Sequence, residues 1–137
     1  MSKVKTVQTF KHTVWLDFSK YIRLRDCLKT TGTPYYGKCI TCGKTFSFIQ
    51  LQAGHFIGGR HPSNLFSEKG VNAQCTRCNK WLYGNPLEYR RKIIEMYGEG
   101  ADVELELEAA RSKKFTMEEL ERIRAEIKEK IKKLEKK

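Results

Sequence analysis

The sequence predicts an α+β fold, in which a small zinc-stapled core of two strands and a helix is flanked by helices and followed by a long C-terminal amphipathic helix. Two matching Cys-x-x-Cys pairs, Cys39–Cys42 and Cys75–Cys78, enclose a 32-residue interval. Strand-like patterns occur inside and beside that interval. Apolar residues at helical spacing lie on both sides of it. These three observations favour one small domain with a helical appendage.

The net charge of +11 is unevenly placed along the chain. Residues 1–45 contribute +7 and residues 46–95 contribute +4, whereas residues 96–115 contribute −2 and residues 116–137 contribute +2. A basic surface on the cysteine-framed region attracts polyanions, of which nucleic acid is the usual one. Solubility alone is the alternative.

No apolar run is long enough to span a membrane, and no signal-peptide pattern is present. We therefore expect a cytoplasmic protein without a membrane partner. In that reducing compartment, paired cysteines bind metal more often than they form disulfides.

The N-terminal part predicts an arm and a helix. Residues 1–13 are expected to be a flexible basic arm. Residues 14–29 show helical periodicity, and residues 30–34 contain the Gly and Pro that end the helix. Arg23 and Arg25 occupy its polar faces and are candidate DNA contacts. The odd fifth cysteine of this helix, Cys27, is interpreted as a buried small hydrophobe.

The region around the cysteine pairs predicts a strand, a loop, a second strand and a helix, over residues 46–53, 58–64, 71–74 and 75–83. Gly84 is expected to end that helix. Trp81 and Tyr83 are interpreted as part of its apolar, core-facing side, because the helix needs such a face, with base stacking as the alternative. We treat residues 14–98 as the core domain.

Residues 99–137 are expected to form a C-terminal helical segment. Asn85 and Glu88 predict a capping box for a helix over residues 86–97, which precedes this segment. Residues 101–111 predict a second helix, and Thr116 is the expected N-cap of the last one. That last helix carries a narrow apolar stripe formed by Leu120, Ile123, Ile127, Ile131 and Leu134. The stripe predicts packing on the same domain or dimerisation with a second copy, and both alternatives remain open.

The two cysteine pairs predict a structural Zn²⁺ site. Each Cys-x-x-Cys turn brings two thiolates together, so Cys39, Cys42, Cys75 and Cys78 complete a tetrahedral shell with no open position. A closed shell of this kind stabilises structure and carries out no chemistry. A pair of reduced or redox-active cysteines is the alternative, and two matching pairs argue against it.

His55, Asn72 and Asn79 are the candidate catalytic residues. A neutral imidazole can take a proton from water near pH 7. The side-chain oxygen of Asn79 is a hard ligand suited to Mg²⁺ or Mn²⁺. A zinc-held unit with a His on a strand and an Asn on the following helix resembles the ββα-metal nuclease arrangement. The alternative is that His55 is structural, as a lone His at a strand end commonly is.

Several motifs taken together resemble the phage NinG (Rap) recombination proteins. They are YIRLRD, CxxCGK, QAGHFI and VNAQCxxCN, at residues 21–26, 39–44, 52–57 and 71–79. The resemblance covers roughly residues 14–98. It implies a phage-encoded, structure-specific DNA endonuclease, which in the bacterial host cell cuts branched recombination intermediates such as Holliday junctions or D-loops.

The core is also similar to the wider HNH group, including resolvases of the endonuclease VII type. This resemblance implies that His55 is the general base, Asn72 the structural middle Asn and Asn79 the metal-binding residue. Many HNH enzymes have an Asp just before the base, where this chain has Gly54. The pattern resembles instead the Asp-Arg-Gly-His variant, with Gln52 at the position of its Asp.

The second ligand of the catalytic metal is left open between Gln52, His61 and water. Arg60 and His61 follow the candidate base and are candidate phosphate contacts, as are Arg77 and Lys80 near Asn79. Solvated side chains are the alternative. The leading functional hypothesis is a metal-dependent endonuclease acting on branched or double-stranded DNA. A non-catalytic zinc-stapled DNA-binding module, or a helix-mediated scaffold for other recombination proteins, are the alternatives.

Overall fold

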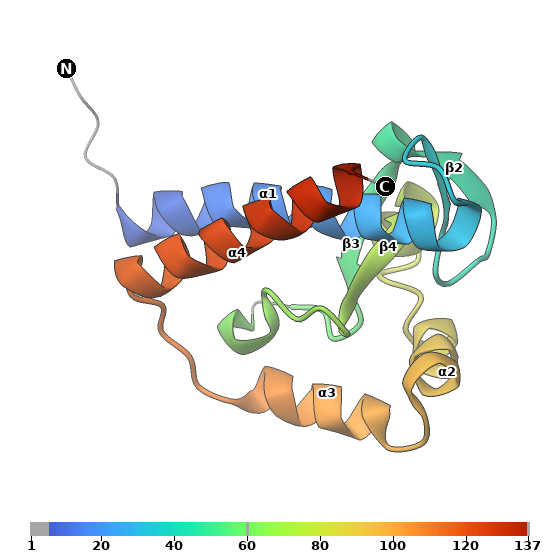
Figure 1. Cartoon of the computed structure of the whole chain (residues 1–137). Helices are drawn as coiled ribbons and strands as arrows, with labels where there is room; N and C mark the ends of the chain where they lie inside the picture. The colour runs from blue at the N-terminus through green and yellow to red at the C-terminus, as the bar shows by residue number, and fades with distance from the viewer. Residues whose placement is uncertain (1–5, 60, 137) are drawn as a thin grey trace.

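The computed structural model describes residues 6–59 and 61–136 and has the expected α+β class. Its helices are α1 (Val7–Thr31), α2 (Pro86–Tyr97), α3 (Ala101–Ala110) and α4 (Met117–Glu135). Its strands are β1 (Tyr36–Lys38), β2 (Thr45–Ser47), β3 (Leu51–His55) and β4 (Val71–Cys75). Helices α1 and α4 run side by side, and α2 and α3 lie on the far side of strands β3 and β4 (Figure 1). Among the described residues, no helix combines the length and apolar character needed to cross a membrane.

Helix α1 begins at Val7, seven residues earlier than the periodicity predicted. The side chain of Thr6 accepts a hydrogen bond from the backbone N–H of Thr9 at 3.1 Å, which caps the helix. Phe10 is only 4% exposed, so the first turns are anchored in the core. The expectation of a flexible arm is therefore wrong for residues 7–13, while residues 1–5 lie outside the described part of the chain.

The strands form two separate antiparallel hairpins, β1–β2 and β3–β4. The single strand expected over residues 46–53 is wrong, because a 3-10 turn at Phe48–Gln50 divides it. The backbone N–H of Ser47 donates to the side-chain oxygen of Gln50 at 3.0 Å and closes this turn. The chain thus leaves one hairpin and enters the other. The strand expected over residues 71–74 is confirmed as β4.

The helix expected over residues 75–83 is a single π-helical turn, Arg77–Trp81. The chain cannot continue as a helix, since Tyr83 and Asn85 adopt positive φ angles of 52° and 48°. Asn85 makes no side-chain cap for α2, so the predicted capping box is absent there. Helix α2 nevertheless ends at Tyr97, as expected.

The main core lies between α1, α4 and one face of the β3–β4 hairpin. The capping box at the start of α4 is confirmed, with Thr116 accepting from the backbone N–H of Glu119 at 3.1 Å. On the apolar stripe, Leu120, Ile127 and Ile131 are buried against α1. The stripe is therefore covered by the same chain. Cys27 is 0% exposed, which confirms its interpretation as a buried residue.

The two faces of the β3–β4 hairpin differ in chemistry. Ala53 and Val71 lie in the main core against α1. Side chains alternate between the faces of a strand, so Gln52, Asn72 and Gln74 lie on the opposite face. That polar face is covered by the π-helical turn and by α2, through hydrogen bonds described below. The candidate site is built around this hairpin.

Replacement of Ile127 by Ala tests the packing of α4 on α1. Ile127 is 4% exposed, and removal of a buried aliphatic side chain leaves a cavity. We expect the free energy of unfolding to fall by about 2–5 kcal/mol, measured by urea denaturation. Lys128→Ala, on the exposed side of α4, is the control and should change it by less than about 0.5 kcal/mol. Equal stability of both variants would show that α4 does not hold α1 in solution.

Candidate metal centre and active site

Four cysteine side chains converge at one end of the molecule. The sulfur atoms of Cys39, Cys42, Cys75 and Cys78 all lie within 4.8 Å of one another, and none forms a disulfide. A tetrahedron with Zn–S bonds of about 2.3 Å has edges of about 3.8 Å. The Cys42 and Cys75 sulfurs are 3.9 Å apart, in agreement with that edge. The cluster is thus able to hold a metal such as zinc.

Backbone geometry brings the two cysteine pairs together. The first pair occupies the turn between β1 and β2, and the second follows directly from β4. The backbone N–H of Ile40 donates to the Ala73 carbonyl at 2.9 Å, which fastens the turn to β4. Two further donors reach sulfur: the backbone N–H of Cys78 to Cys75 at 3.4 Å, and the Asn85 side chain to Cys78 at 3.7 Å. Such donors orient metal-binding thiolates.

The protonation of these thiols depends on their surroundings. Burial raises the pKa of Cys75 to about 12. Burial also acts to raise the pKa of Cys39, but hydrogen bonds led by the backbone N–H of Cys42 lower it to about 7. A metal binds thiolates, so binding at neutral pH displaces protons from this cluster.

His55 lies at the end of β3, on the face that packs against α1. Its ring stacks on Trp15, with centroids 5.2 Å apart and planes at 18°. Its Nε2 atom is 3.2 Å from the Leu65 carbonyl oxygen. A carbonyl oxygen only accepts, so Nε2 carries the proton of the neutral ring and Nδ1 is left as a proton acceptor.

The pKa of His55 is lowered from its ordinary value. Burial of the ring is the main cause, and the charge of His61 acts in the same direction. Hydrogen bonds to the backbone near Leu65 oppose the shift. Since the net direction is downward, the imidazole is neutral at pH 7.

The first turns of α1 form one side of a groove beside His55. This groove of about 280 Å³ is lined by Gln8, Lys11, His12, Trp15 and Leu65. Two of these residues, Trp15 and Leu65, contact the His55 ring. The sequence interpretation missed this wall because it assigned residues 1–13 to an arm. Two features of the sequence could have predicted the earlier helix start. One is Phe10, four residues before Val14, and the other is the Thr6–Thr9 pair, which can cap a helix.

Asn79 lies on the π-helical turn and faces the polar side of the hairpin. Its side-chain nitrogen donates to the Gln52 side-chain oxygen at 2.8 Å. Its oxygen lies 2.8 Å from the point where a Cβ on Gly54 would stand, and the Gln74 oxygen lies 1.9 Å from that point. Any side chain at Gly54 would collide with Gln74. Glycine is therefore the residue that this position accommodates.

The Gln74 side chain has an unpaired oxygen. Its nitrogen donates to the Gly84 carbonyl at 3.0 Å and to the Thr41 hydroxyl at 3.2 Å, which fixes the orientation of the amide. Its oxygen is buried and has no hydrogen-bond partner among the described residues. Amide oxygens are hard donors. The group around Gly54 therefore fits a hard cation held by neutral oxygens, with Asn79 as the half-buried, accessible donor.

His55 and Asn79 do not lie on the same face of the hairpin. His55 packs with Trp15 of α1, whereas Asn79 contacts Gln52 on the polar face. Gly54, next to which the Asn79 oxygen lies, and His55 are consecutive residues of β3, with Cα atoms about 3.8 Å apart.

Asn72 and Arg25 form the structural support of the hairpin. Asn72 is 1% exposed, and its oxygen accepts from Arg25 at 3.1 Å. Arg25 also donates to the Glu68 and Val71 carbonyls at 2.7 and 3.1 Å and pairs with Asp26 at 2.8 Å. The guanidinium of Arg25 is thus engaged inside the protein, and its contact with DNA stays a prediction.

Tyr89 of α2 is a buried support that the sequence interpretation did not assign. It is 0% exposed. Its hydroxyl donates to the Gly54 carbonyl at 2.7 Å and accepts from Asn72 at 3.2 Å. Burial raises the pKa of Tyr89, so the hydroxyl keeps its proton as a donor. Its apolar position on a helix gave no sign of this polar role.

The remaining candidate DNA contacts differ in accessibility. Arg77 and Lys80 are exposed on the π-helical turn, and His61 is half-buried close to His55. Arg23 is half-buried, with its guanidinium 4.5 Å from the Phe48 ring centre. Arg60 lies outside the described residues.

Two aromatic residues next to the site are not part of a core. Trp81 is 68% exposed and Tyr83 is 91% exposed, so the expectation that they are buried is wrong. The helix that would have required an apolar face is only one turn long, which removes the physical basis of that expectation.

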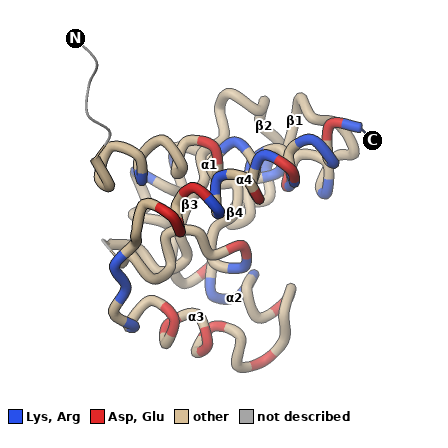
Figure 2. Tube along the Cα trace, turned by 60° about the vertical axis from the view of Figure 1, so that its left-hand side comes forward, with Lys and Arg blue, Asp and Glu red and all other residues tan. Residues whose placement is uncertain are grey.

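The charge around the site is almost entirely basic. Between Asp26 and Glu88 the sequence contains a single acidic residue, Glu68, which pairs with Lys130 at 2.6 Å. Acidic residues instead gather on α3 (Figure 2). The region around the cysteine cluster thus presents cations with few neutralising partners.

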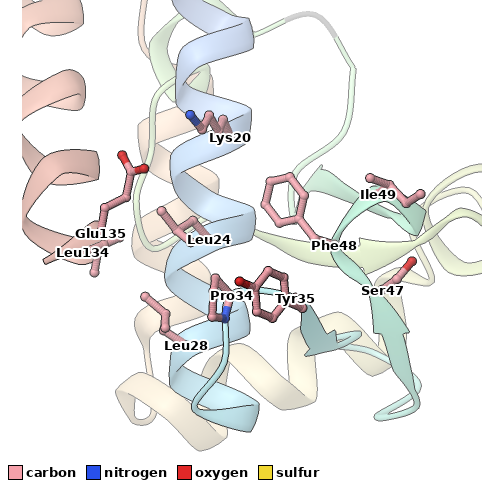
Figure 3. Close-up of a pocket in the computed structure, with 10 residues that line it drawn as sticks. All are labelled: Lys20, Leu24, Leu28, Pro34, Tyr35, Ser47, Phe48, Ile49, Leu134 and Glu135. Carbon is pink, nitrogen blue, oxygen red and sulfur yellow. The ribbon is translucent and has the colours of Figure 1, made fainter. Parts of the chain in front are cut away.

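A larger groove of about 510 Å³ lies between α1, the end of α4 and the turn before β3 (Figure 3). Its lining is mainly apolar and includes Leu24, Leu28, Phe48 and Leu134. It contains none of the candidate catalytic or metal-binding residues.

Comparison with known proteins identifies a phage family. The family model described as "Bacteriophage Lambda NinG protein" matches residues 1–137. Over 97 residues the chain is 37% identical to Protein ninG of Salmonella phage P22 and 36% identical to Protein ninG of Escherichia phage lambda. Each match covers 70% of this chain and 47% of the relative, so the chain spans about half the length of these curated relatives. No solved structure matches the chain.

Replacement of Cys39 by Ser tests the metal centre. We expect loss of bound zinc and a lower unfolding temperature, because a site with three thiolates binds far more weakly. Zinc content and thermal unfolding are the measurements. Cys27→Ser, outside the cluster, is the control and should keep its zinc even if it is less stable. Full zinc content and thermal stability in Cys39→Ser would exclude the four-cysteine site.

Proposed function

We propose that this chain, which belongs to the bacteriophage lambda NinG family, is a metal-dependent DNA endonuclease that hydrolyses phosphodiester bonds in branched recombination intermediates. One observation carries the proposal: a neutral histidine at the end of β3 lies beside a groove, and a carboxamide oxygen lies close to the preceding residue, Gly54. A phosphodiester hydrolase needs a base and an electrophile on opposite sides of one phosphorus.

His55 is the proposed general base. Its Nδ1 takes a proton from the attacking water, while the Leu65 carbonyl and the Trp15 ring keep the imidazole in one tautomer and orientation. The lowered pKa of His55 keeps the ring available as a base at neutral pH.

Asn79 is the proposed ligand of Mg²⁺ or Mn²⁺. Such an ion, when bound, neutralises charge on the phosphate and on the leaving 3′-oxygen. Gln52 holds the Asn79 amide so that its oxygen faces away from that contact. The Gln74 oxygen is the nearest further donor, and waters complete a magnesium shell that takes few protein ligands.

The substrate follows from charge and family. The basic surface around residues 27–87 suits a phosphate backbone, and Lys11 and His12 lie in the groove next to His55. The preference for branched DNA rests on the resemblance of the motifs to recombination endonucleases. Four-way junctions require two cuts, which favours a homodimer as the acting species.

A non-catalytic zinc-stapled DNA-binding module is the second candidate. The packing of His55 against α1, on the face opposite Asn79, favours it. The absence of a carboxylate at position 54 also favours it, because an ion held by neutral oxygens alone is bound weakly.

His55→Ala separates the two candidates. We expect nicking of a synthetic junction or fork with Mg²⁺ to fall by about 10²–10⁴-fold, since the general base is lost. His12→Ala, an exposed histidine of the same groove, is the control and should lose far less activity. Equal cleavage by His55→Ala and the unaltered chain would exclude His55 as the base, and no cleavage by either with any divalent ion would favour the binding module.

Asn79 is tested by two substitutions. Asn79→Ala should abolish cleavage and keep the zinc content, whereas Asn79→Asp should retain cleavage because it keeps a hard oxygen ligand. Loss of zinc from Asn79→Ala would assign the residue to the structural site instead.

The pH dependence of cleavage reports the state of His55. The reaction requires the neutral ring, so the rate should rise with pH and level off with a midpoint below the ordinary histidine pKa of about 6.5. His61→Ala should move the midpoint upward, because the charge of His61 contributes to the lowered pKa. A midpoint well above 6.5 in the unaltered chain would contradict the assignment.

A further inference from the structure

Two aromatic rings stand in solvent directly after Asn79. Trp81 and Tyr83 are 68% and 91% exposed. Aromatic side chains usually bury most of their large apolar surface. Two exposed rings on neighbouring positions of one short turn therefore indicate a surface that meets a partner.

The backbone holds these rings outward in a strained conformation. Tyr83, Gly84 and Asn85 have successive positive φ angles of 52°, 89° and 48°. A bulky residue rarely adopts this region, and such strain persists where surrounding contacts enforce it. Here the Gly84 N–H donates to the Cys78 carbonyl at 2.9 Å, and the Asn85 side chain donates to the Cys78 sulfur at 3.7 Å. The metal-binding cysteine thus fixes the turn.

Cations surround the two rings. Arg77 and Lys80 are exposed on the same turn, and neither forms an ion pair within the described part of the chain. The Lys80 ammonium lies 5.7 Å from the Trp81 ring centre. No acidic residue occurs between Glu68 and Glu88. Flat rings beside unpaired cations are the combination that binds single-stranded nucleic acid, where bases stack and phosphates pair with the cations.

We propose that Trp81 and Tyr83 form a stacking platform for unpaired DNA bases, flanked by Arg77 and Lys80 as phosphate contacts. Bases inside a duplex are already stacked on their neighbours, so the platform distinguishes unpaired from paired strands. This inference rests on the proposed function and deepens it: unpaired nucleotides at a branch are held within the same helical turn as Asn79. The platform then selects phosphodiester bonds next to a branch.

The test compares DNA binding by the double variant Trp81→Ala/Tyr83→Ala with the unaltered chain. Binding is measured by fluorescence anisotropy without added Mg²⁺, using a single strand and a blunt duplex of about 20 nucleotides, longer than the site sizes of typical single-strand binders. We expect affinity for the single strand to fall about tenfold or more, and affinity for the duplex to change by less than about twofold. Tyr35→Ala/Tyr36→Ala, which removes two exposed tyrosines near β1, is the matched control and should leave both affinities unchanged.

The salt dependence separates rings from cations. The ring variant should keep the slope of log affinity against log salt, because it loses no phosphate contact. Arg77→Ala/Lys80→Ala should reduce that slope for both DNAs by about 1.4–1.8, for two contacts. An equal change of slope in both variants would overturn the division of roles.

Tryptophan fluorescence supplies a second readout if the double variant folds poorly. Poly-dT should quench the emission of the unaltered chain by stacking on Trp81, and Trp81→Phe, which keeps a flat ring, should bind but lose that quenching. Three outcomes would overturn the platform. The first is unchanged quenching in Trp81→Phe. The others are an equal loss of affinity for single strand and duplex in the double variant, or a change of its mass in solution with no change of its DNA affinity. Binding is measured without cleavage. The binding result therefore stays interpretable even if the chain does not hydrolyse DNA.

Discussion

The convergence of four thiols is the constraint on which the site depends. The β1–β2 hairpin is short and has few apolar residues of its own, and β4 ends at the same place. A metal held between Cys39, Cys42, Cys75 and Cys78 joins these two segments and fixes the turn that carries Asn79. Sulfur ligation of a metal would therefore help to set the position of Asn79 relative to Gly54.

Much of the architecture could be predicted from local signals. Identical cysteine spacings predicted the metal cluster, and the Thr116–Glu119 capping box predicted the start of α4. The errors arose where tertiary contacts override local pattern. The Ser47–Gln50 hydrogen bond divides an apparently continuous strand, and positive φ angles at Tyr83 and Asn85 stop a helix whose composition is permissive. Sequence periodicity contains neither kind of information.

The candidate site was predictable in its residues but not in its arrangement. His55 and Asn79 were predicted from motif and chemistry. Their positions on opposite faces of the β3–β4 hairpin follow from the strand register, which sequence spacing alone does not give. Arg25 illustrates a related difficulty. An arginine on the polar side of a helix is usually predicted to be a surface cation. Here Arg25 instead donates hydrogen bonds to the Glu68 and Val71 carbonyls and to the side chain of Asn72. Basic residues near the candidate site thus divide between those that support the fold and those on the surface.

The pairing of α1 with α4 has a consequence for how the chain is made. Asp17 and Arg124, which pair at 2.9 Å across these helices, are 107 residues apart. Helix α1 is synthesised before α4, so its apolar side stays uncovered until α4 has been made. The cysteine cluster needs only residues up to Cys78, so metal uptake can organise the hairpins while the apolar side of α1 is still open. An apolar helix face that is open during synthesis exposes the chain to aggregation before folding is complete.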